Sequence, residues 1–226
     1  MAVQRSQKNF VKSHTEQISS PTVPEIKLNL VTENCEMWTM NEEQVSELGI
    51  PSPFWGFVWP GGHALARYLL DHPHITRGKT VVDIGTGAGI VAIAAALCGA
   101  KRVIANDIDE LALVATKLNC ELNNVSMETN GQDLVGSDHK GWDVILAADM
   151  CYESALTKRM ATWLQTQTKK GTRVIFADPN RGWLQKYPVE IVAQYETPCD
   201  IDCRGRYLQT TFIYNFSEIN SPLSSS

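Results

Sequence analysis

Residues 81–90 read VVDIGTGAGI, in which an aspartate and three alternating glycines follow directly on a short apolar run. An apolar run that leads into glycines and then into a segment of small residues is typical of a strand, a tight turn and a helix. Glycines in such a turn allow positive φ angles and a close approach of the backbone to a ligand. The stretch therefore predicts a β-α unit with a ligand site at its turn.

Segments with strand and helix patterns alternate around this turn. Two β-α units in succession require a parallel sheet with right-handed crossovers. The last two strands follow each other without an intervening helix, which indicates an antiparallel pair at the C-terminal end. We therefore predict a Rossmann-like α/β fold with a mostly parallel sheet and helices on both faces. The expected strands are 79–84, 102–107, 142–148, 172–178, 188–198 and 206–216, and the expected helices are 89–98, 109–123 and 154–168.

Length and composition narrow the possible functions. With 226 residues and 43% hydrophobic composition, the chain is long enough for one α/β domain and too short for two ordinary ones. A formal net charge of −5 does not favour a nucleic-acid partner, which usually requires clustered basic residues. No apolar stretch approaches the roughly 18 residues of a membrane span. The six cysteines include no C-x-x-C pair, so no metal is expected.

The two ends of the chain differ in composition from its middle. Residues 1–24 are polar, with three basic residues and one acid, and predict a flexible segment that is either disordered or the remnant of a targeting sequence. Residues 218–226 are of low complexity and predict a flexible tail. Between them we expect an N-terminal extension with a lid over residues 25–78 and the main α/β domain over residues 79–217.

Four aspartates stand at the predicted carboxyl ends of strands. Ligands of parallel α/β sheets bind beyond these ends, where the strand order reverses. Any one of the four could instead cap a helix or lie in a solvated turn. Their occurrence at four strand ends together favours a ligand site. They are Asp83, Asp107, Asp149 and Asp178.

The spacing of the turn selects the kind of ligand. A dinucleotide site has the pattern G-x-G-x-x-G and places a pyrophosphate at the helix N-terminus, whereas this turn is D-x-G-x-G-x-G. An acid beside a diphosphate would repel it. S-adenosylmethionine has no phosphate and carries an ammonium and a sulfonium, so Asp83 favours its cationic end.

Asp107 follows Gly85 by 22 residues, which is the spacing at which an acid binds ribose hydroxyls in nucleotide folds. A nicotinamide dinucleotide would use the same acid. A phosphate-binding loop would need a G-K-[ST] sequence, and no such lysine follows Gly89. The turn D-x-G-x-G-x-G resembles that of the class I, seven-stranded, S-adenosylmethionine-dependent methyltransferases. This resemblance implies a mostly parallel sheet of seven strands and S-adenosylmethionine as the cofactor.

The acceptor is indicated by the segment after the strand over residues 142–148. Amino-methyltransferases that act on adenine or glutamine carry D/N-P-P-Y at the matching position, and both prolines are absent here. The sequence Asp149-Met150-Cys151-Tyr152 resembles the D-x-x-Y motif of seven-stranded protein lysine methyltransferases. A carboxylate suits an aliphatic amine, which must lose a proton from a pKa near 10.4 before it attacks a methyl group.

Two tryptophans precede a Pro-Gly-Gly turn in SPFWGFVWPGG, residues 52–62. Trp55 and Trp59 could form an aromatic clasp on the domain, which is the commoner use of buried tryptophan. They could also form a lid whose rings face the cofactor or the cationic amine. The sequence leaves both possibilities open.

A closer resemblance is carried by a series of motifs over roughly residues 24–185. The segments PEIKLNLVT, PFWGFVWPGG, RYLLDHP, GAKRVIANDID, LNCELN, DMCY and DPNR resemble the electron transfer flavoprotein beta subunit lysine methyltransferase family, which is similar to the ribosomal-protein L11 methyltransferases. The resemblance implies a flavoprotein subunit as the substrate. It also implies a location in the mitochondrial matrix, or in the cytoplasm for bacterial members. Two positions depart from the family pattern, Cys151 where an aromatic is expected and Asn180 where glycine is expected.

The resemblance implies a role for each matching residue. Asp149 and Tyr152 would be catalytic and hold the target lysine, and Asp133 would accept a hydrogen bond from the adenine amino group. Trp55, Asp178 and Arg181 would bind the substrate at the acceptor entrance, although Asp178 and Arg181 could equally be a helix cap and a surface cation. The implied cofactor-binding residues are Trp59, Asp83, Gly85, Thr86, Gly87, Gly89, Asp107, Ile108, Asp133 and Ala148.

Alternatives from other classes remain. A nicotinamide-dependent oxidoreductase would bind NAD and transfer no methyl group, and a non-catalytic binding module would clamp a protein partner without chemistry. Among methyltransferases, the alternative substrate is a lysine of a ribosomal or other protein. We expect a protein substrate, no nucleic acid, no membrane and no metal, and a monomeric chain.

Overall fold

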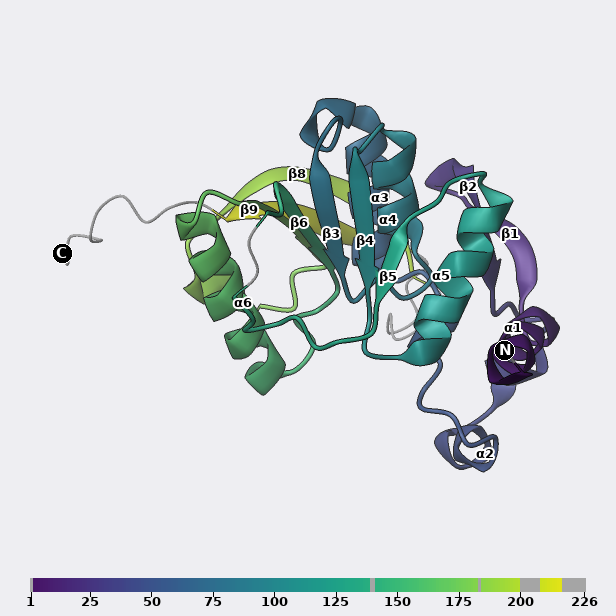
Figure 1. Cartoon of the computed structure of the whole chain (residues 1–226). Helices are drawn as coiled ribbons and strands as arrows, with labels where there is room; N and C mark the ends of the chain where they lie inside the picture. Colours follow the sequence, from purple (N-terminus) through teal and green to yellow (C-terminus); the bar gives the residue numbers. More distant parts are fainter. Residues whose placement is uncertain (1, 139–140, 183, 200–207, 217–226) are drawn as a thin grey trace.

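The computed structural model describes residues 2–138, 141–182, 184–199 and 208–216. A seven-stranded sheet with the order β5-β4-β3-β6-β7-β9-β8 forms its centre (Figure 1). The strands are β3 (Thr80–Ile84), β4 (Arg102–Asn106), β5 (Glu128–Asn130), β6 (Val144–Ala148), β7 (Arg173–Asp178), β8 (Val189–Pro198) and β9 (Leu208–Phe216). The first five are parallel, and β9 pairs antiparallel with both β7 and β8. The predicted fold class is confirmed.

Strand alternation divides the core between the two faces of the sheet. Val81 and its neighbours on one face pack against α3 (Pro60–Asp71) and α4 (Ile90–Leu97). Val82 and its neighbours on the other face pack against α6 (Ser154–Lys169), which lies on the opposite side of the sheet in Figure 1. Because helices cover both faces, the strand ends are the part of the sheet left open to a ligand. None of the described helices is long and apolar enough to cross a bilayer.

The N-terminal segment differs from the prediction. Residues 1–24 were expected to be flexible, but they contain α1 (Ala2–Ser13), β1 (Glu16–Ser20) and the start of β2 (Val23–Leu30), with which β1 pairs. Val11 is completely buried against α5 (Glu110–Leu122). Burial of this apolar face stabilises a helix that its polar composition alone does not predict. The predicted tail, residues 218–226, and residue 217 lie outside the described residues.

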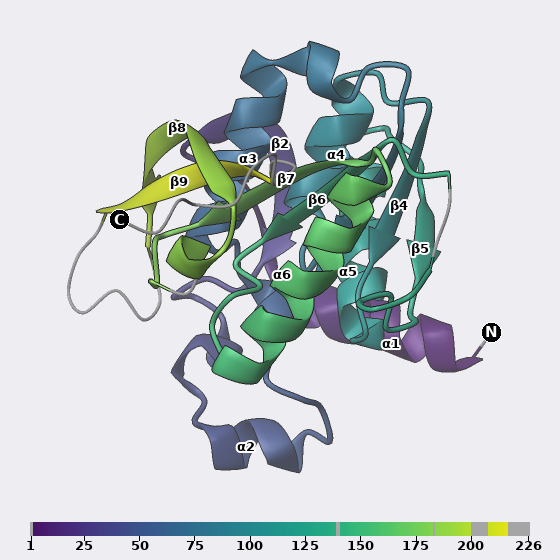
Figure 2. The same ribbon diagram turned by 90° about the vertical axis from the view of Figure 1, so that its left-hand side faces the viewer.

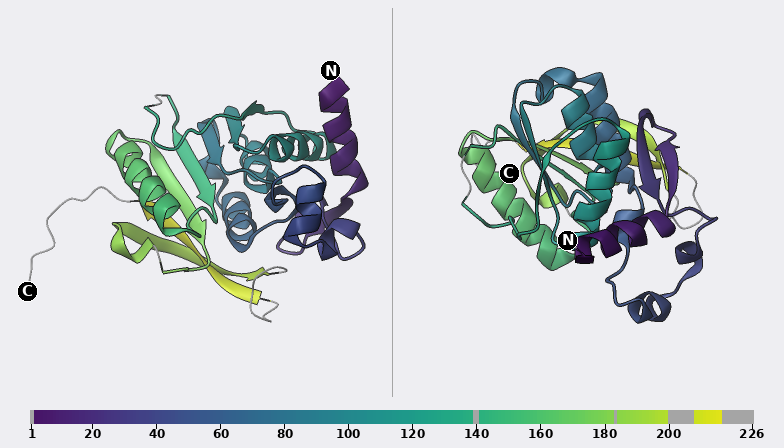
Figure 3. Two further views of the ribbon diagram at one scale, coloured as in Figure 1. Left: turned by 90° about the horizontal axis from the view of Figure 1, so that it is seen from below. Right: turned by 45° about the vertical axis from the view of Figure 1, so that its right-hand side comes forward.

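A lobe connects β2 to α3 and contains η1 (Glu36–Thr39), α2 (Glu42–Glu47) and η2 (Phe54–Gly56). The helix α2 projects from the body of the molecule below the sheet (Figures 1 and 2). The left-hand view of Figure 3 shows the molecule from this side. Two further 3₁₀ helices, η3 (Pro73–Ile75) and η4 (Leu184–Lys186), follow α3 and β7. The chain returns from the lobe through Trp59, which is the N-cap of α3, so the lobe leads directly to the strand ends.

Candidate active site

The turn between β3 and α4 has the backbone that its glycines predict. Gly85, Gly87 and Gly89 have φ angles of 69°, 53° and 85°, in the left-handed region that favours glycine. At position 85 a side chain would also collide with the sulfur of Met150, whereas at position 87 a Cβ would meet no atom within 4 Å. The turn is therefore closed on the side of Met150 and open at Gly87.

Asp83 stabilises this turn from inside. Its side chain is buried at the end of β3, and Oδ2 accepts a hydrogen bond of 2.7 Å from the hydroxyl of Thr86. Burial raises the pKa of Asp83 to about 7, and the charge of Asp107 adds to this rise. The carboxyl group is thus engaged within the turn, and its contact with the cationic end of a ligand stays a prediction.

Asp107 lies beside the same turn, just beyond the end of β4. Its Oδ2 accepts a hydrogen bond of 2.9 Å from the amide of Gly87, and its Oδ1 accepts one of 3.0 Å from the amide of Asp109. Burial raises the pKa of this carboxyl group. The next residue, Ile108, is 73% exposed. A fixed carboxylate followed by an uncovered apolar side chain suits ribose hydroxyls and a planar base.

Sequence reasoning assigned no role to α5, although this helix holds the turn in place. The Nδ2 of Asn119 donates a hydrogen bond of 2.8 Å to the carbonyl of Ala88, and the hydroxyl of Thr116 donates one of 3.0 Å to the carbonyl of Gly87. Asn119 also accepts hydrogen bonds from the backbone and side chain of Asn29 in β2. The sequence feature that could have identified Asn119 is its position as a polar residue on the apolar face of an amphipathic helix.

These contacts explain two of the sequence motifs together. Asn119 and Asn123 of LNCELN bind Asn29 and Lys27 of PEIKLNL. The distances from Asn123 are 2.9 Å to the amide and 2.6 Å to the carbonyl of Lys27. The two motifs therefore connect the N-terminal hairpin, formed by β1 and β2, to α5 and to the turn between β3 and α4.

Asp149 follows β6 in an unusual backbone conformation, with a φ angle of 58°. Few residues besides glycine tolerate this region, and aspartate is one of them. The carboxylate Oδ2 accepts a hydrogen bond of 3.0 Å from the amide of Gly62 in the first turn of α3. Burial raises the pKa of Asp149 to about 7, against the effect of Arg181. The carboxyl group of Asp149 therefore lies at the position predicted to bind the acceptor, with the charge of Arg181 beside it.

The Pro-Gly-Gly turn packs directly on this carboxyl group. At Gly61, a Cβ would lie 2.5 Å from Oδ2 of Asp149 and 2.8 Å from the carbonyl oxygen of Ala177. Only glycine leaves room for the carboxylate at the N-terminus of α3. Anionic groups are stabilised at this end of a helix by the backbone amides and the helix dipole.

Arg181 brings Asp149 and Asp178 together. Its Nη1 lies 2.8 Å from Oδ2 of Asp178 and 3.2 Å from Oδ1 of Asp149. The backbone amide of Arg181 donates a further hydrogen bond of 2.9 Å to Oδ1 of Asp178. Burial raises the pKa of Asp178. The three residues therefore form one cluster at the ends of β6 and β7, in which the two acids are mostly buried and Arg181 is partly exposed.

The two departures from the family pattern have structural explanations. Asn180 has a φ angle of 59°, which asparagine tolerates in place of the expected glycine. Cys151 is completely buried in the core beneath α6, and burial raises the pKa of its thiol to about 12. Cys151 is therefore a small apolar residue and not a nucleophile.

Tyr152 and Trp59 lie closer to the surface than the core residues beside them. The side chain of Tyr152 is 56% exposed, and its hydroxyl has no hydrogen-bond partner within the described part of the chain. Trp59 is partly buried; its Nε1 donates a hydrogen bond of 3.2 Å to the carbonyl of Phe54, and the two rings meet edge to face. Their predicted contacts with lysine and cofactor stay predictions.

The predicted substrate-binding role of Trp55 is wrong. Its side chain is 1% exposed and packs with Val11 of α1 and Leu111 of α5. The indole therefore joins the lobe to the N-terminal helix instead of facing an acceptor. Its Nε1 has no hydrogen-bond partner among the described residues.

Asp133 and Ala148 complete the predicted cofactor set. Asp133 Oδ2 lies 2.5 Å from Nη2 of Arg159, and Oδ1 accepts a hydrogen bond from the amide of Val135. Ala148 is the partly buried last residue of β6, directly before Asp149. The predicted contact of Asp133 with adenine and the predicted cofactor-binding role of Ala148 stay predictions.

The residues present fit S-adenosylmethionine. Position 87 is open, Asp107 is fixed at the turn, and Ile108 offers an exposed apolar side chain. The turn contains no lysine or arginine that would hold a phosphate. Within the described ranges, no group of three or more His, Cys, Asp or Glu side chains could hold a metal ion.

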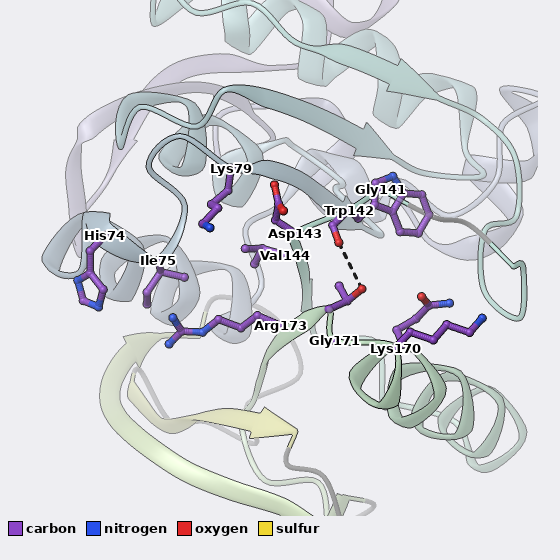
Figure 4. A pocket seen from close by; sticks show the side chains of 12 residues that line it. His74, Ile75, Lys79, Gly141, Trp142, Asp143, Val144, Lys170, Gly171 and Arg173 are labelled. Atoms are coloured by element: carbon purple, nitrogen blue, oxygen red, sulfur yellow. Dashed lines mark hydrogen bonds between the residues drawn. The ribbon is translucent and has the colours of Figure 1, made fainter.

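A pocket of about 440 Å³ lies at the other end of the sheet (Figure 4). Lys79 and Asp143 line it directly before β3 and β6, and so does Arg173, the first residue of β7. Ligands of parallel sheets bind at the carboxyl ends of the strands. This pocket is therefore separate from the candidate active site.

Comparison with known proteins bears on the chemistry of the site. The family model described as ribosomal protein L11 methyltransferase (PrmA) matches residues 64–192. The electron transfer flavoprotein beta subunit lysine methyltransferase of Danio rerio is 45% identical over 217 residues, which cover 93% of this chain and 83% of the relative. The relative of the same name in Xenopus laevis is 41% identical over 194 residues, covering 83% and 78% of the two chains.

Solved structures agree with the fold. Magnesium protoporphyrin IX methyltransferase from Synechocystis with bound S-adenosylhomocysteine superposes with a TM-score of 0.52 at 16% identity, over 80% of this chain and 91% of that chain. At this identity the likeness shows the fold alone. The sequence relatives show the activity, because their identity extends over most of both chains. The chain therefore belongs to the electron transfer flavoprotein beta subunit lysine methyltransferase family, whose members are S-adenosylmethionine-dependent protein-lysine methyltransferases.

Proposed function

We propose that the protein substrate of this chain is the beta subunit of an electron transfer flavoprotein, methylated on lysine side chains. The observation that carries the proposal is the extent of the similarity to the relatives of that name. The match to the Danio rerio relative covers 93% of the chain and so must include much of residues 1–63, which the ribosomal-protein model does not match. These residues contain the lobe and the N-terminal hairpin.

The chemistry of the lobe supports a lysine-bearing protein surface as its partner. No lysine or arginine occurs between Lys27 and Arg67. Phe54 and Trp38 are exposed on the lobe, and Trp59 leads from it to the Gly62 amide that binds Asp149. An acidic surface attracts a basic segment and steers its approach. The acids of the lobe are Glu33, Glu36, Glu42, Glu43 and Glu47.

In the proposed reaction, the residues at the strand ends have separate roles. Asp107 holds the ribose, the open turn at Gly87 receives the methionine part, and Ile108 covers the base. Asp149 holds the target amine beside the methyl group, and Tyr152 closes the mouth of the site. When bound, S-adenosylmethionine supplies a methyl group on a sulfonium sulfur, which an amine takes as the carbon–sulfur bond breaks.

Asp149 also bears on the protonation of the substrate. A lysine enters as an ammonium and must lose a proton before its nitrogen has a lone pair for attack. The carboxylate of Asp149 attracts the ammonium, while removal from water favours the neutral amine. The contribution of the chain is alignment of this amine, and alignment of reacting groups supplies several kcal/mol of a barrier.

The test is incubation of the chain with purified electron transfer flavoprotein and methyl-labelled S-adenosylmethionine. We expect label on lysines of the beta subunit, located by mass spectrometry, and loss of label with Asp149→Asn. Asp143→Asn is the matched control. Asp143 directly precedes β6, at the opposite end of this strand from Asp149, and its carboxylate accepts a hydrogen bond from the amide of Thr80. An unlabelled beta subunit in the presence of folded chain contradicts the assignment.

A second candidate is a lysine of ribosomal protein L11. It is favoured by the family model over residues 64–192 and by a relative of Caldicellulosiruptor saccharolyticus named for that protein, 46% identical over 89 residues. That match covers only 30% of the relative. A competition assay with both purified substrates decides between them: a preference for the ribosomal protein would reverse the assignment.

The compartment follows from the proposed substrate. We propose the mitochondrial matrix for a eukaryotic source and the cytoplasm for a bacterial one, with the chain acting as a monomer. Fluorescence of the tagged full-length chain tests the first statement, and light scattering of the purified protein tests the second. A particle of twice the mass of one chain would contradict the monomer.

A further inference from the structure

One nitrogen of Arg181 is shared between two buried carboxylates. Nη1 lies 2.8 Å from Asp178 and 3.2 Å from Asp149. The side chain of Arg181 is 27% exposed, whereas both acids are mostly buried. The Arg181 side chain is therefore partly exposed to solvent, whereas the two carboxylates that it contacts are mostly buried.

The charges of this cluster do not balance. With both acids ionised, Asp149 and Asp178 contribute two negative charges and Arg181 contributes one positive charge. The remaining neighbours add none at neutral pH, because burial keeps the thiol of Cys151 and the phenol of Tyr214 protonated, raising the pKa of each to about 12. Gly62 contributes an amide N–H to Asp149. When both acids are ionised, the site therefore has one uncompensated negative charge, which is equal and opposite to the charge of one lysine ammonium.

We propose that Arg181 is a positioning residue that neutralises Asp178, so that only the charge of Asp149 faces the amine of the target lysine. Arg181 binds Asp178 through two donors, its own backbone amide and Nη1, and these two contacts fix it to that acid. The longer contact with Asp149 leaves this carboxylate available to the substrate. The proposal rests on lysine methylation as the activity of the site.

The consequence for catalysis is a balance between binding and deprotonation. Two uncompensated carboxylates would bind the ammonium more strongly and oppose loss of its proton, because each nearby negative charge raises the pKa of an amine. A single uncompensated carboxylate still attracts the lysine, but it raises the pKa of the amine less than two would. Arg181 also keeps the two acids from repelling each other, which would favour uptake of a proton by one of them.

The first test is the pH profile of methylation by Arg181→Gln. Without the cation, we expect the acid limb of kcat/KM to move to higher pH by about one unit or more. At alkaline pH, where both acids are ionised, we expect a lower kcat with an unchanged or lower KM for the protein substrate. Arg181→Lys keeps the charge and is expected to restore the acid limb to its wild-type position.

A matched control is available on α3. Arg67 also bridges two acids, Glu25 and Asp71, and its side chain is 23% exposed. Arg67→Gln is expected to leave the pH profile unchanged. An equal loss of activity at every pH in Arg181→Gln, or a failure of Arg181→Lys to restore the acid limb, would overturn the proposal and make Arg181 a structural residue.

The second test needs neither substrate nor cofactor. The free energy of unfolding of Arg181→Gln is compared with wild type by denaturant titration between pH 5 and 8. We expect the deficit of the variant to grow as pH rises, because ionisation of Asp149 and Asp178 is then uncompensated. A deficit that is constant with pH contradicts the proposal. This measurement does not depend on which protein is the substrate. It can therefore contradict the role of Arg181 separately from the proposed function.

Discussion

The amide of Gly62 donates a hydrogen bond of 3.0 Å to the carboxylate of Asp149, across 87 residues of sequence. This contact joins two motifs, the Pro-Gly-Gly turn that begins α3 and the D-x-x-Y segment that follows β6. The helix N-terminus supplies amide donors and a favourable dipole to the carboxylate. The tryptophan-containing lobe and the acceptor site are thus parts of one arrangement.

Gly61→Ala is expected to damage the site directly. Its Cβ would lie 2.5 Å from Oδ2 of Asp149, so either α3 or the carboxylate must move. We expect about a tenfold or greater loss of kcat/KM and a loss of about 1–3 kcal/mol in the free energy of unfolding. Gly62→Ala is the control: its Cβ would make only ordinary contacts of 3.4 Å, and its amide donor remains. Equal activity of the two variants would contradict this account.

Asn119→Ala tests the connection between α5 and the cofactor turn. The change leaves the carbonyl of Ala88 and the amide of Asn29 without their partner. We expect a loss of about 2–4 kcal/mol in the free energy of unfolding and weaker binding of S-adenosylhomocysteine by calorimetry. Asn123→Ala removes hydrogen bonds with the backbone of Lys27 and with the carbonyl of Asn119. None of these contacts is with the cofactor turn, so this variant should leave the affinity unchanged. Wild-type affinity in the Asn119 variant would count against the connection.

Ile108→Ala separates cofactor binding from stability. The side chain is 73% exposed, so its truncation should change the free energy of unfolding by less than about 0.5 kcal/mol. If Ile108 covers the base, the dissociation constant of S-adenosylmethionine should rise severalfold because apolar contact is lost. Leu97→Ala, at another exposed apolar side chain, is the control. An unchanged dissociation constant would remove Ile108 from the site.

Asp149 is expected to make stability depend on pH. Its pKa is raised from about 3.9 in the unfolded chain to about 7 in the folded chain, so between these values the folded state binds the extra proton. The contribution of Asp149 to stability is therefore complete below pH 4 and is lost as pH rises to 7, with a slope of at most about 1.4 kcal/mol per pH unit.

Asp149→Asn should remove this slope in urea unfolding measured from pH 4 to 8. Asp83, whose pKa burial also raises to about 7, contributes a slope of the same sign, so wild type and variant must be compared at each pH. A difference between them that does not change with pH would show that Asp149 titrates normally in the folded chain.

The elements of the main domain could be predicted from sequence because their signals are local. Apolar periodicity located each predicted strand and helix of the main domain to within a few residues, and alternating glycines located the turn after β3. The prediction missed β5, which is only three residues long, Glu128–Asn130, and is a strand because it pairs with β4. It also missed α1, whose apolar face is identified only by its contact with α5.

The sequence by itself determined which residue types stand at the strand ends, because a strand, a glycine turn and a helix are each encoded within a few residues. Only the tertiary structure decided which of them meet. It placed Trp55 in the core, Asn119 against the cofactor turn, and Arg181 between Asp149 and Asp178. The physical reason is that these contacts depend on the order of strands in the sheet and on the packing of α3 and α5, which no local pattern encodes.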